Sequence, residues 1–428
     1  MRLCFFNRSY WPDQAATGQL LTELAEDLVS RFGWQVTVVA GAALNAHPAH
    51  AGRARWTPIA REERGGVAIV RANGTTFRPK RFVARATNYV TYLGSAAIAS
   101  LALPRQDVVV SLTDPPVIGR IARSVARRHG AAFVFLCEDV FPEVASLVED
   151  FHDERVNRLL DRTYRYLLRE ADAVIALGDR MRSRLVDEKG AEPARVHIVH
   201  NWADCEAVRP APKENAFSRA HGLVDKFVVM HSGNVGLSQN LDVLVEAAGR
   251  LAPHPDIVIA VVGDGARRQT LQDRANRRGL TNLRFFPYQP KELLIDSFAA
   301  ADVFLVSLRP GLEGYIVPSK LYGILAAGRP FIAATDPSCE AAALGARHEC
   351  GLWARPDDPD ALAAAILALR GNPELTATMG HRARQLAMRF DRRVAVEAYH
   401  DLFKQLRPET DPTRERVRVK TDATTEPA

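Results

Sequence analysis

The sequence lacks any continuous apolar run of the roughly 18–20 residues that a membrane-spanning helix needs. The nearest approach, residues 88–103, is interrupted by Asn88, Thr91 and Ser95. Cysteine is scarce: the five residues at positions 4, 137, 205, 339 and 350 form no CxxC pair and no cluster with histidine at zinc-binding spacing. These absences argue against a membrane-spanning protein and a disulfide framework, and they predict a protein of the reducing cytoplasm.

Several sequence motifs that are typical of particular enzyme classes are also missing. The chain has no GxGxxG dinucleotide fingerprint, no Walker A loop, no GxSxG nucleophile elbow and no HExxH pair. Its histidines are dispersed, and His197, His200 and His231 fall at the ends of predicted strands without further ligands nearby in sequence. We therefore expect neither a resident cofactor nor a metal site.

The amino-acid composition is that of an ordinary soluble protein with more basic than acidic residues. The 428 residues are 47% apolar and 25% charged, with a net charge of +6, enough for two or three domains. The positive charge suits a polyanionic partner, such as nucleic acid, anionic lipid or a phosphorylated small molecule, or it is only an arginine-rich surface. No basic motif studded with aromatic residues is present, so we expect no nucleic-acid partner.

The chain reads as two successive series of short β-branched strands and amphipathic helices. In the first series the expected strands are 2–7, 35–40, 107–112, 132–137, 173–176 and 197–199, with helices at 18–32, 118–128 and 155–170. In the second the strands are 227–231, 257–262, 283–286, 303–307, 331–334 and 351–354, with helices at 241–251, 267–278, 291–300, 320–327 and 359–370. Two βαβ series predict two doubly wound α/β domains.

The domain limits follow from the breaks in this pattern. Pro210, Ala211 and Pro212 mark a linker-like stretch, so we expect domains at 1–205 and 206–390. A last amphipathic helix is expected at 391–405. Residues 407–428 are charged and almost free of large apolar side chains, which predicts a disordered tail.

Residues 77–103 join a basic stretch to an apolar one. Phe77, Arg78, Lys80 and Arg81 precede the apolar segment that begins at Asn88. A helix here would suit the surface of an anionic membrane. The alternative is a helix packed on a sheet with a solvated first turn.

In open parallel sheets, ligands bind beyond the carboxyl ends of the strands, so the segments that follow the strands are the candidate site. After the first strand, Gly18 opens a helix, which allows a ligand near the backbone or simply close packing. After strand 132–137 come Glu138 and Asp139, with Glu143 four residues later. These acids predict one edge of a site, the alternative being helix capping and surface ion pairs.

The second series carries more polar and glycine residues at these positions. Strand 227–231 leads into a loop with Asn234 and Gln239, and strand 257–262 into a tight turn where a flat ring could stack. That turn is Gly263, Asp264 and Gly265. Strand 303–307 leads to Pro318, Ser319 and Lys320 at the start of a helix, an arrangement that favours an anion. Each loop alone fits an ordinary βα turn, but three on one sheet edge favour a diphosphate-linked ligand.

These residues resemble a known family. The stretches GNVGLSQNLDVLVEAA, VVGDG, FFPYQPKELL, AADVFLVSL and PSKLYGILAAGRPFIA, with YWPDQAATGQLL and EDVFPEVASLV in the amino half, occur in the order typical of retaining GT-B glycosyltransferases of family 4. The chain is similar to the branch of colanic-acid and O-antigen transferases, including those that handle N-acetyl-fucosamine. The resemblance implies two Rossmann-like domains facing across a cleft. The carboxyl domain would hold a nucleotide sugar, the amino domain the acceptor, and the last helix would cross back to the first domain.

The resemblance also implies roles for particular residues. The arginine and lysine that are usual in the first carboxyl-domain loop correspond to Asn234 and Gln239 in this sequence. The resemblance therefore implies that Lys320 supplies part of the positive charge that those two residues provide. Glu313 resembles the first of the family's paired glutamates, as a sugar-hydroxyl ligand, whereas the second falls on Gly323.

Other family positions are altered as well. Glu340 could replace the missing ribose-binding carboxylate. Glu138 stands where many relatives have a histidine in the catalytic region, and Asp139 aligns with the acid beside it. No metal is implied, because helix dipoles and cations would neutralise the leaving diphosphate.

The resulting hypothesis is a retaining transferase that moves an amino or deoxy hexose from a UDP donor to a polyprenyl-linked or glycan acceptor in surface polysaccharide synthesis. Such an enzyme would work in the cytoplasm, peripherally on the inner face of the plasma membrane. The first alternative is a UDP-sugar 2-epimerase of the same architecture, which needs acid and base groups around the sugar. The second is a non-enzymatic scaffold or nucleic-acid-binding protein, motivated only by the basic charge.

Overall fold

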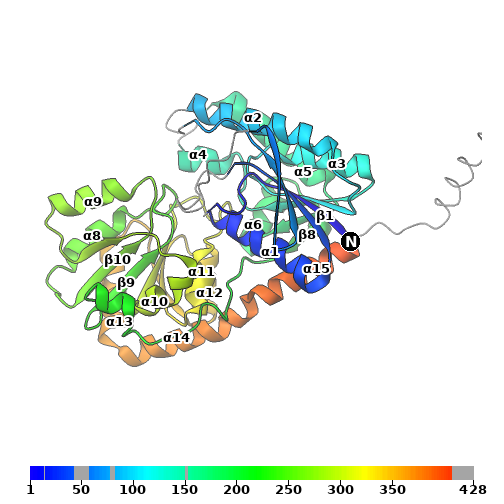
Figure 1. Ribbon diagram of the computed structural model, residues 1–428. Helices are drawn as coiled ribbons and strands as arrows, with labels where there is room; N and C mark the ends of the chain where they lie inside the picture. The colour runs from blue at the N-terminus through cyan, green and yellow to red at the C-terminus, as the bar shows by residue number, and fades with distance from the viewer. Residues whose placement is uncertain (14, 43–56, 78–81, 150–152, 407–428) are drawn as a thin grey trace, which may run out of the picture.

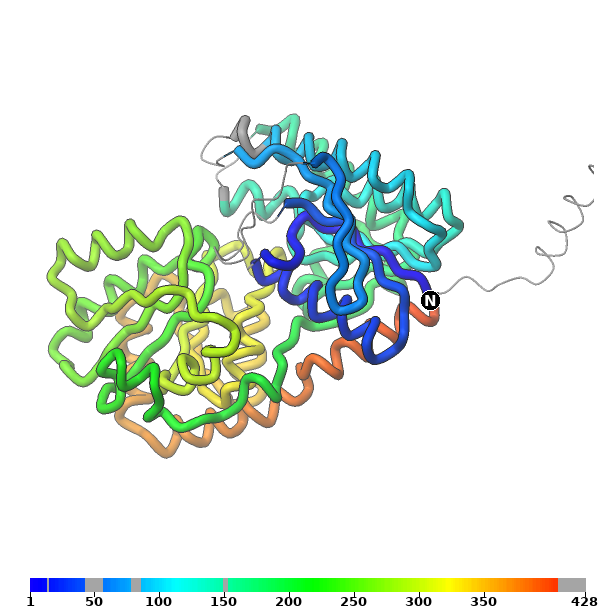
Figure 2. Tube along the Cα trace, in the orientation of Figure 1, coloured from blue at the N-terminus to red at the C-terminus, as the bar shows by residue number. Residues whose placement is uncertain are grey.

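The structure is a computed structural model that describes residues 1–13, 15–42, 57–77, 82–149 and 153–406. It has two lobes, each with a central sheet flanked by helices (Figure 1). The trace passes from the first lobe to the second and returns to the first in its last helices (Figure 2). The expected disordered tail at 407–428 lies outside the described residues.

The first lobe is built on an eight-stranded sheet of order β3-β4-β2-β1-β5-β6-β7-β8. Its strands are β1 (Arg2–Phe6), β2 (Gln35–Ala40), β3 (Ile59–Arg64), β4 (Val67–Ala72), β5 (Val108–Ser111), β6 (Ala132–Cys137), β7 (Ala173–Ala176) and β8 (Val196–Ile198). All neighbours pair in parallel except β3 and β4, which are antiparallel. This is a doubly wound sheet with one antiparallel edge strand, as the βαβ pattern predicts.

Two layers of helices cover this sheet. They are α1 (Ala16–Phe32), α2 (Phe82–Leu101), α3 (Gly119–His129), α4 (Glu143–Glu149), α5 (Glu154–Glu170) and α6 (Asp179–Ser183), followed by a π turn (Arg184–Glu188) and a 3-10 turn (Pro193–Arg195). In Figure 1, α2, α3 and α5 lie across the upper side of the lobe and α1 across the lower side. Local signals set the helix ends: Gly33 stops α1 in a left-handed conformation, and the Asp153 carboxylate caps the start of α5.

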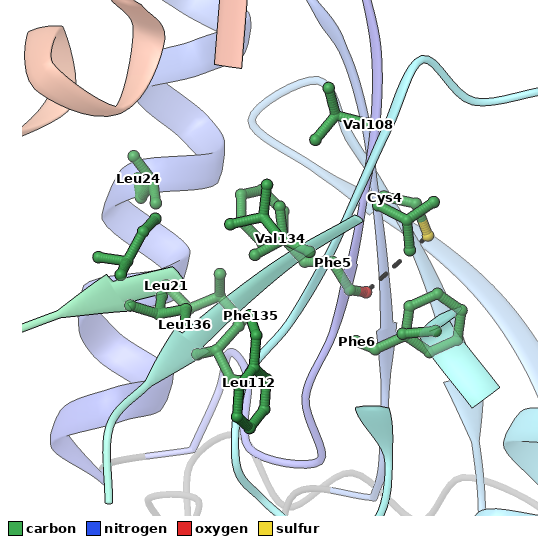
Figure 3. Packing of buried hydrophobic residues seen from close by; sticks show 14 of the residues in the cluster. Cys4, Phe5, Phe6, Leu21, Leu24, Val108, Leu112, Val134, Phe135 and Leu136 are labelled. Atoms are coloured by element: carbon green, nitrogen blue, oxygen red, sulfur yellow. Dashed lines mark hydrogen bonds between the residues drawn. The ribbon is translucent and has the colours of Figure 1, made fainter. Parts of the chain in front are cut away.

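The core of this lobe lies on both faces of the sheet. Phe5 of β1 is fully buried on the face that α1 covers with Leu21 and Leu24 (Figure 3). Phe135 of β6 is buried on the other face, where its ring packs against Tyr164 of α5 with the ring centroids 5.2 Å apart. Burying one such side chain stabilises the fold by about 1.5–3 kcal/mol. The strands are apolar on both faces because helices cover both, which is why they read as continuous rather than alternating runs.

The second lobe is built on a six-stranded parallel sheet of order β11-β10-β9-β12-β13-β14. Its strands are β9 (Phe227–Ser232), β10 (Ile257–Val262), β11 (Leu283–Phe286), β12 (Val303–Ser307), β13 (Phe331–Ala334) and β14 (Gly351–Ala354). Its helices are α7 (Ala216–Ala220), α8 (Asp242–Arg250), α9 (Arg268–Arg277), α10 (Leu294–Ala299) after a 3-10 turn (Lys291–Leu293), α11 (Lys320–Ala326), α12 (Glu340–Arg347), α13 (Pro359–Gly371) and α14 (Pro373–Ala387). The strand order is that of a dinucleotide-binding Rossmann sheet.

The last helix, α15 (Arg392–Gln405), follows a 3-10 turn (Met388–Phe390) and crosses back to the first lobe (Figure 1). The Arg392 guanidinium makes a bidentate bond to Asp27 of α1, with distances of 2.7 and 2.8 Å. Phe403 packs on Phe5, with the ring centroids 6.3 Å apart. These contacts join α15 to α1 and β1 of the first lobe.

Both connections between the lobes run together. The Ala203 amide donates to the Phe390 carbonyl at 3.1 Å, and the Arg392 amide donates to the Ala203 carbonyl at 2.9 Å. The Asp391 carboxylate accepts from the Cys205 amide at 3.2 Å. The outgoing linker and the returning chain thus form one hydrogen-bonded pair. We keep 1–205 and 206–390 as the proposed domain limits.

The sequence pattern missed the hairpin of β3 and β4. Most of β3 is exposed, and its sequence IAREER has no apolar run that would predict a strand. The signal that was available is the pair Gly65 and Gly66, both with positive φ, which suits a two-residue hairpin turn. The pattern also missed α14, although Asn372 caps it and Pro373 opens it. Among the described residues, no helix combines the length and apolarity required to span a bilayer.

Candidate active site

The carboxyl ends of β9, β10 and β12 bring the three predicted loops of the second domain together. The Gly233 amide donates to the Val262 carbonyl at 2.9 Å, and the Val235 amide donates to the Asp264 carbonyl at 2.8 Å. A Cβ on Gly263 would lie 1.9 Å from the Gly233 carbonyl oxygen. The glycines are therefore needed for the loops to touch each other, whether or not a ligand binds.

Lys320 reaches into this group of loops from the start of α11. Its Nζ lies 3.1 Å from Nε2 of His231 and 3.5 Å from Nδ1 of the same ring, at the end of β9. Burial lowers the pKa of Lys320 to about 7. Burial, and then the charge of Lys320, hold the pKa of His231 well below its usual value. Lys320 lies between the loops after β9 and β12, where a diphosphate was expected.

The other polar residues of the loops have local roles. The Gln239 side-chain oxygen accepts from the Gly236 amide at 2.9 Å, which stabilises the loop after β9. The Asp264 carboxylate accepts from the Gly265 amide at 2.7 Å. Asn234 and Asp264 are both exposed at the rim of the loops. The amide side chains of Asn234 and Gln239 carry no charge. The cationic side chains at these loops include Lys320 and Arg268, whose guanidinium donates to the Gly263 carbonyl.

The Pro318-Ser319-Lys320 segment ends the loop after β12. Pro318 is buried, and Ser319 is half-buried at the position before α11. The Ser319 side chain makes no capping hydrogen bond to the helix. Its hydroxyl is thus not used to satisfy the helix start and is available for a ligand.

Glu313 lies where the two domains touch. Its carboxylate accepts from the Gly311 amide at 2.9 Å and lies 3.5 Å from the Arg184 guanidinium of the first domain. Arg184 Nε also donates to the Glu313 carbonyl at 3.3 Å, and the guanidinium lies over the Tyr315 ring, 4.4 Å from its centroid. Tyr315 in turn donates to Glu188 at 2.7 Å. Sequence reasoning missed Arg184 because nothing in the local sequence indicates which loop it meets.

Asp139 faces the same loop from the first domain, and Glu138 precedes it at the end of β6. Asp139 forms an antiparallel bridge with Ile316, and the neighbouring Val140 amide donates to the Tyr315 carbonyl at 3.0 Å. Burial, reinforced by the charge of Asp139, raises the pKa of Glu138 to about 8. Burial, reinforced by Asp114, raises the pKa of Asp139 to about 7. Both acids can therefore hold a proton near neutral pH.

Two more acids belong to this edge of the first sheet and were not predicted. Asp114, after β5, accepts from Arg8 Nε at 3.2 Å, and burial raises its pKa against the opposing effect of Arg8. Asp13, after β1, is 8% exposed; one carboxylate oxygen accepts from Ser9 at 2.9 Å, and the other has no hydrogen-bond partner among the residues that the structure describes. Their position after strands was the signal that could have identified them.

Gly18 is placed close to this edge by its packing. A Cβ at Gly18 would lie 2.7 Å from the Ser9 hydroxyl and 3.3 Å from the Tyr10 amide. Gly18 is buried against its own loop. The glycine is accounted for by the return of this loop onto α1, and its role in donor binding stays a prediction.

Glu340 opens α12 and contacts the first domain. It is 8% exposed, and its carboxylate lies 3.5 Å from Nδ1 of His200. A Cβ on Gly178 would come within 2.7 Å of the same carboxylate. Burial, with a contribution from Asp179, raises the pKa of Glu340 to about 7. Glu340 thus sits between the domains, and its contacts are with Gly178 and His200 rather than with the Lys320 loops.

Comparisons with known proteins agree with this geometry. The "Glycosyl transferase 4-like domain" model matches residues 16–202, and the "Glycosyl transferases group 1" model matches residues 213–386. The probable glycosyltransferase WbjE of Pseudomonas aeruginosa is 31% identical over 282 residues, which cover 65% of this chain and 69% of WbjE. The chain belongs to the group 1 glycosyltransferases.

Two further relatives extend the comparison. The putative colanic acid biosynthesis glycosyl transferase WcaI of Escherichia coli K12 is 31% identical over 164 residues, 38% of this glycosyltransferase and 40% of WcaI. The crystal structure of the Anabaena HepE protein in complex with UDP aligns with a TM-score of 0.71, 16% identity, and coverage of 95% of this chain and 100% of HepE. At that identity the likeness is one of fold, and the fold is GT-B, as the sequence resemblance implied.

Among residues 1–13, 15–42, 57–77, 82–149 and 153–406, no three or more histidine, cysteine, aspartate and glutamate side chains are grouped so that they could hold a metal ion. The carboxylates described above are instead spread over several strand ends and the domain boundary.

Proposed function

We propose that the protein is a retaining, metal-independent hexosyltransferase that moves an amino or deoxy hexose from a UDP donor to a polyprenyl-linked or glycan acceptor. The acceptor chain would belong to a surface polysaccharide. The nucleotide sugar would bind the second domain and the acceptor the first. In this proposal the branch is that of the colanic-acid and O-antigen transferases.

The observation that carries the proposal is Lys320 among the loops that follow β9, β10 and β12. Lys320 has no carboxylate partner among the described residues and lies next to glycine turns where backbone can approach a ligand, which suits a diphosphate. The Ser319 hydroxyl adds an uncommitted donor beside it. The names of the relatives support the same choice: WcaI is named for colanic acid biosynthesis, and HepE was crystallised with UDP.

The acids of the first domain suit recognition of an acceptor hydroxyl. Glu138 and Asp139 have raised pKa values near neutral pH, so each can donate or accept a hydrogen bond. In a front-face mechanism the departing diphosphate takes the proton of the attacking hydroxyl, while Lys320 stabilises the charge left on the phosphate. Glu313 would bind a donor sugar hydroxyl, and Glu340 would bind the ribose, in both cases after some rearrangement of the domain contact.

The membrane part of the proposal rests on the outer face of α2. Val90, Ile98 and Leu101 are 67%, 63% and 71% exposed and lie along one side of this helix at helical spacing. Seven of the ten exposed positions of the neighbouring helices α3 and α5 are arginine: Arg120, Arg127, Arg128, Arg155, Arg158, Arg162 and Arg169. The other three are Ser124, Glu154 and Leu159. An apolar stripe beside arginines suits the inner face of the plasma membrane, with anionic lipid as the partner.

The test is release of nucleoside diphosphate from a panel of UDP-, GDP- and ADP-sugars, with and without a polyprenyl-linked acceptor extract. We expect release from one UDP-sugar that depends on the acceptor, and a product with the anomeric configuration of the donor. Failure of UDP- and GDP-sugars to bind the folded protein would refute the donor site.

The 2-epimerase alternative receives no support from the comparisons, which match transferase families over both halves of the chain. It is distinguished in the same assay. An epimerase would change the stereochemistry of the UDP-sugar without acceptor and without release of UDP.

A further inference from the structure

Lys320 and His231 form a pair of basic groups that cannot both be charged. The lysine Nζ lies 3.1 Å from Nε2 of the imidazole, and His231 is completely buried. Because the imidazole is excluded from water and the lysine is only partly exposed, two positive charges at this distance would repel each other strongly. The pair therefore holds at most one extra proton.

In the described part of the chain, no carboxylate forms a hydrogen bond or ion pair with Lys320 or His231. His231 faces Lys320 and the carbonyl of Asn234, 3.3 Å from Nε2. From α14, which packs along α11, Arg384 reaches the carbonyl of Ala326 at the far end of the helix. Glu313, on the loop before α11, is engaged by Gly311 and by Arg184 of the first domain. Among the described residues, no ion pair includes Lys320.

The ring nitrogen Nε2 also has a choice of partner. When it carries a hydrogen, it can donate to the Asn234 carbonyl; when it is bare, it can accept from the lysine ammonium. A neutral lysine therefore goes with the first arrangement and a charged lysine with the second. The empty site can accommodate Lys320 in its neutral form without leaving the histidine unpaired.

We propose that Lys320 is largely neutral in the empty site at slightly alkaline pH and takes up one proton from solvent when the diphosphate of the nucleotide sugar binds beside it. This inference rests on the proposed function, because it assumes that the diphosphate binds at Lys320. An anion within about 4–6 Å favours the ammonium form, so binding restores the charge that burial had removed. Release of the product diphosphate returns the proton to solvent.

The proposal has a thermodynamic signature. Burial lowers the pKa of free Lys320 to about 7, and a bound diphosphate raises it again. Below pH 6 the lysine is charged before and after binding, so no proton is taken up. Above pH 7 binding requires a proton, so affinity for the donor falls by up to about tenfold for each pH unit.

The experiment is isothermal titration calorimetry of the full chain with UDP-glucose, UDP-N-acetylglucosamine and GDP-mannose at pH 5.5 and pH 8.5. Each titration is run in two buffers of different ionisation enthalpy, so that the difference in heat counts the protons exchanged. The diphosphate of these sugars does not titrate between the two pH values. The number of protons taken up by the Lys320→Arg variant described below is subtracted as the baseline. After this subtraction, we expect uptake of close to one proton at pH 8.5 and close to none at pH 5.5.

The matched control is Lys320→Arg. Arginine keeps a positive charge but stays protonated throughout this range. The variant therefore reports any protons exchanged by Glu138, Asp139 or Glu340, and its own affinity should not fall between pH 7 and 8.5. Equal proton uptake by the natural protein and Lys320→Arg at pH 8.5 would overturn the proposal.

A second variant, His231→Gln, identifies which member of the pair takes the proton. Glutamine can accept from Lys320 and donate to the Asn234 carbonyl without titrating. We expect proton uptake to persist in this variant, and its loss would assign the proton to His231 instead. If none of the three donors binds to protein with a normal thermal unfolding transition, the proposed function fails; if one binds without proton uptake, only this inference fails.

Discussion

At the scale of single residues, the site is defined by side chains whose charge is opposed by burial. Lys320, Glu138, Asp139 and Glu340 all have pKa values moved toward neutrality, and burial is the largest cause in each case. Such groups cluster at functional sites because they can change protonation state when a ligand arrives. Their types and their positions after strands were visible in the sequence, but their burial was not.

Lys320→Ala is expected to remove turnover while the fold survives. The alanine leaves the departing diphosphate without its cation, which should lower kcat by roughly 10²–10³-fold. The measurement is acceptor-dependent release of nucleoside diphosphate, together with the thermal unfolding midpoint. Lys404→Ala, at an exposed position of α15, is the control. Wild-type turnover in Lys320→Ala would mean that the phosphate site is elsewhere.

Glu138→Gln is expected to stabilise the folded protein at pH 8.5 but not at pH 4. Burial raises the pKa of Glu138 to about 8, so ionisation of this group opposes folding from its unfolded pKa of about 4.3 up to pH 8. The gain in Tm should be near zero at pH 4 and roughly 2–8 °C at pH 8.5. Glu154→Gln, an exposed change on α5, should show no such trend. A gain independent of pH would contradict the burial of the Glu138 charge.

At the scale of elements, strand ends and one helix face place the functional groups. The ends of β9, β10 and β12 gather the donor loops, and α2 presents apolar side chains beside the basic helices α3 and α5. The basic-apolar segment was recognised in the sequence. The arginines of α3 and α5 lie 20 to 70 residues further along and join it only because the three helices cover the same side of the sheet, as Figure 1 shows.

The double variant Val90→Glu/Leu101→Glu is expected to lose binding to anionic vesicles. The changes place acids on the exposed stripe of α2, where they meet lipid instead of protein, so the fold should be kept. Co-sedimentation with vesicles of 30% phosphatidylglycerol measures the effect, which should exceed about tenfold. Leu293→Glu, a change at a 50% exposed residue of the second domain, serves as the control. Equal sedimentation of the natural protein, the double variant and Leu293→Glu would show that this face of α2 does not bind the membrane.

At the scale of the whole molecule, contacts at several places hold the two domains together, among them Glu340 with His200 and Lys291 with Glu23. The returning helix α15 packs on the first domain, the linker pairs with the chain before α15, and the loop 311–317 docks on Arg184 and Asp139. The last contact lies beside the acids of the first domain and just before Lys320. It thus joins the proposed donor loops of the second domain to the acids of the first domain.

Arg184→Met is expected to loosen the domain contact. It removes the bonds to Glu313 and the cation–π contact with Tyr315 while keeping most of the side-chain volume. The radius of gyration from small-angle X-ray scattering should increase, and kcat should fall about tenfold because the two halves of the site meet less often. Arg158→Met, at an exposed position of α5, is the matched control. Unchanged scattering and turnover would show that this loop does not govern closure.

Much of the architecture could be predicted from the sequence because it depends on local periodicity. Strands β2, β6, β7, β10, β11, β12, β13 and β14 have the predicted limits, since buried parallel strands read as uninterrupted apolar runs. The hairpin of β3 and β4 escaped because an exposed edge strand needs no such run. Lys320, Glu138 and Asp139 were likewise found from their place after strands.

By itself, the sequence determined the two βαβ series, the family and the residue types that follow each strand, because all of these are local or ordered along the chain. Only the tertiary structure decided which groups meet. His231 stands 89 residues from Lys320, and Arg184 stands 129 residues from Glu313. Their pairing, and the pKa shifts that follow from it, arise from burial and from the approach of two domains. A pattern along the chain encodes neither distance in space nor exclusion of water.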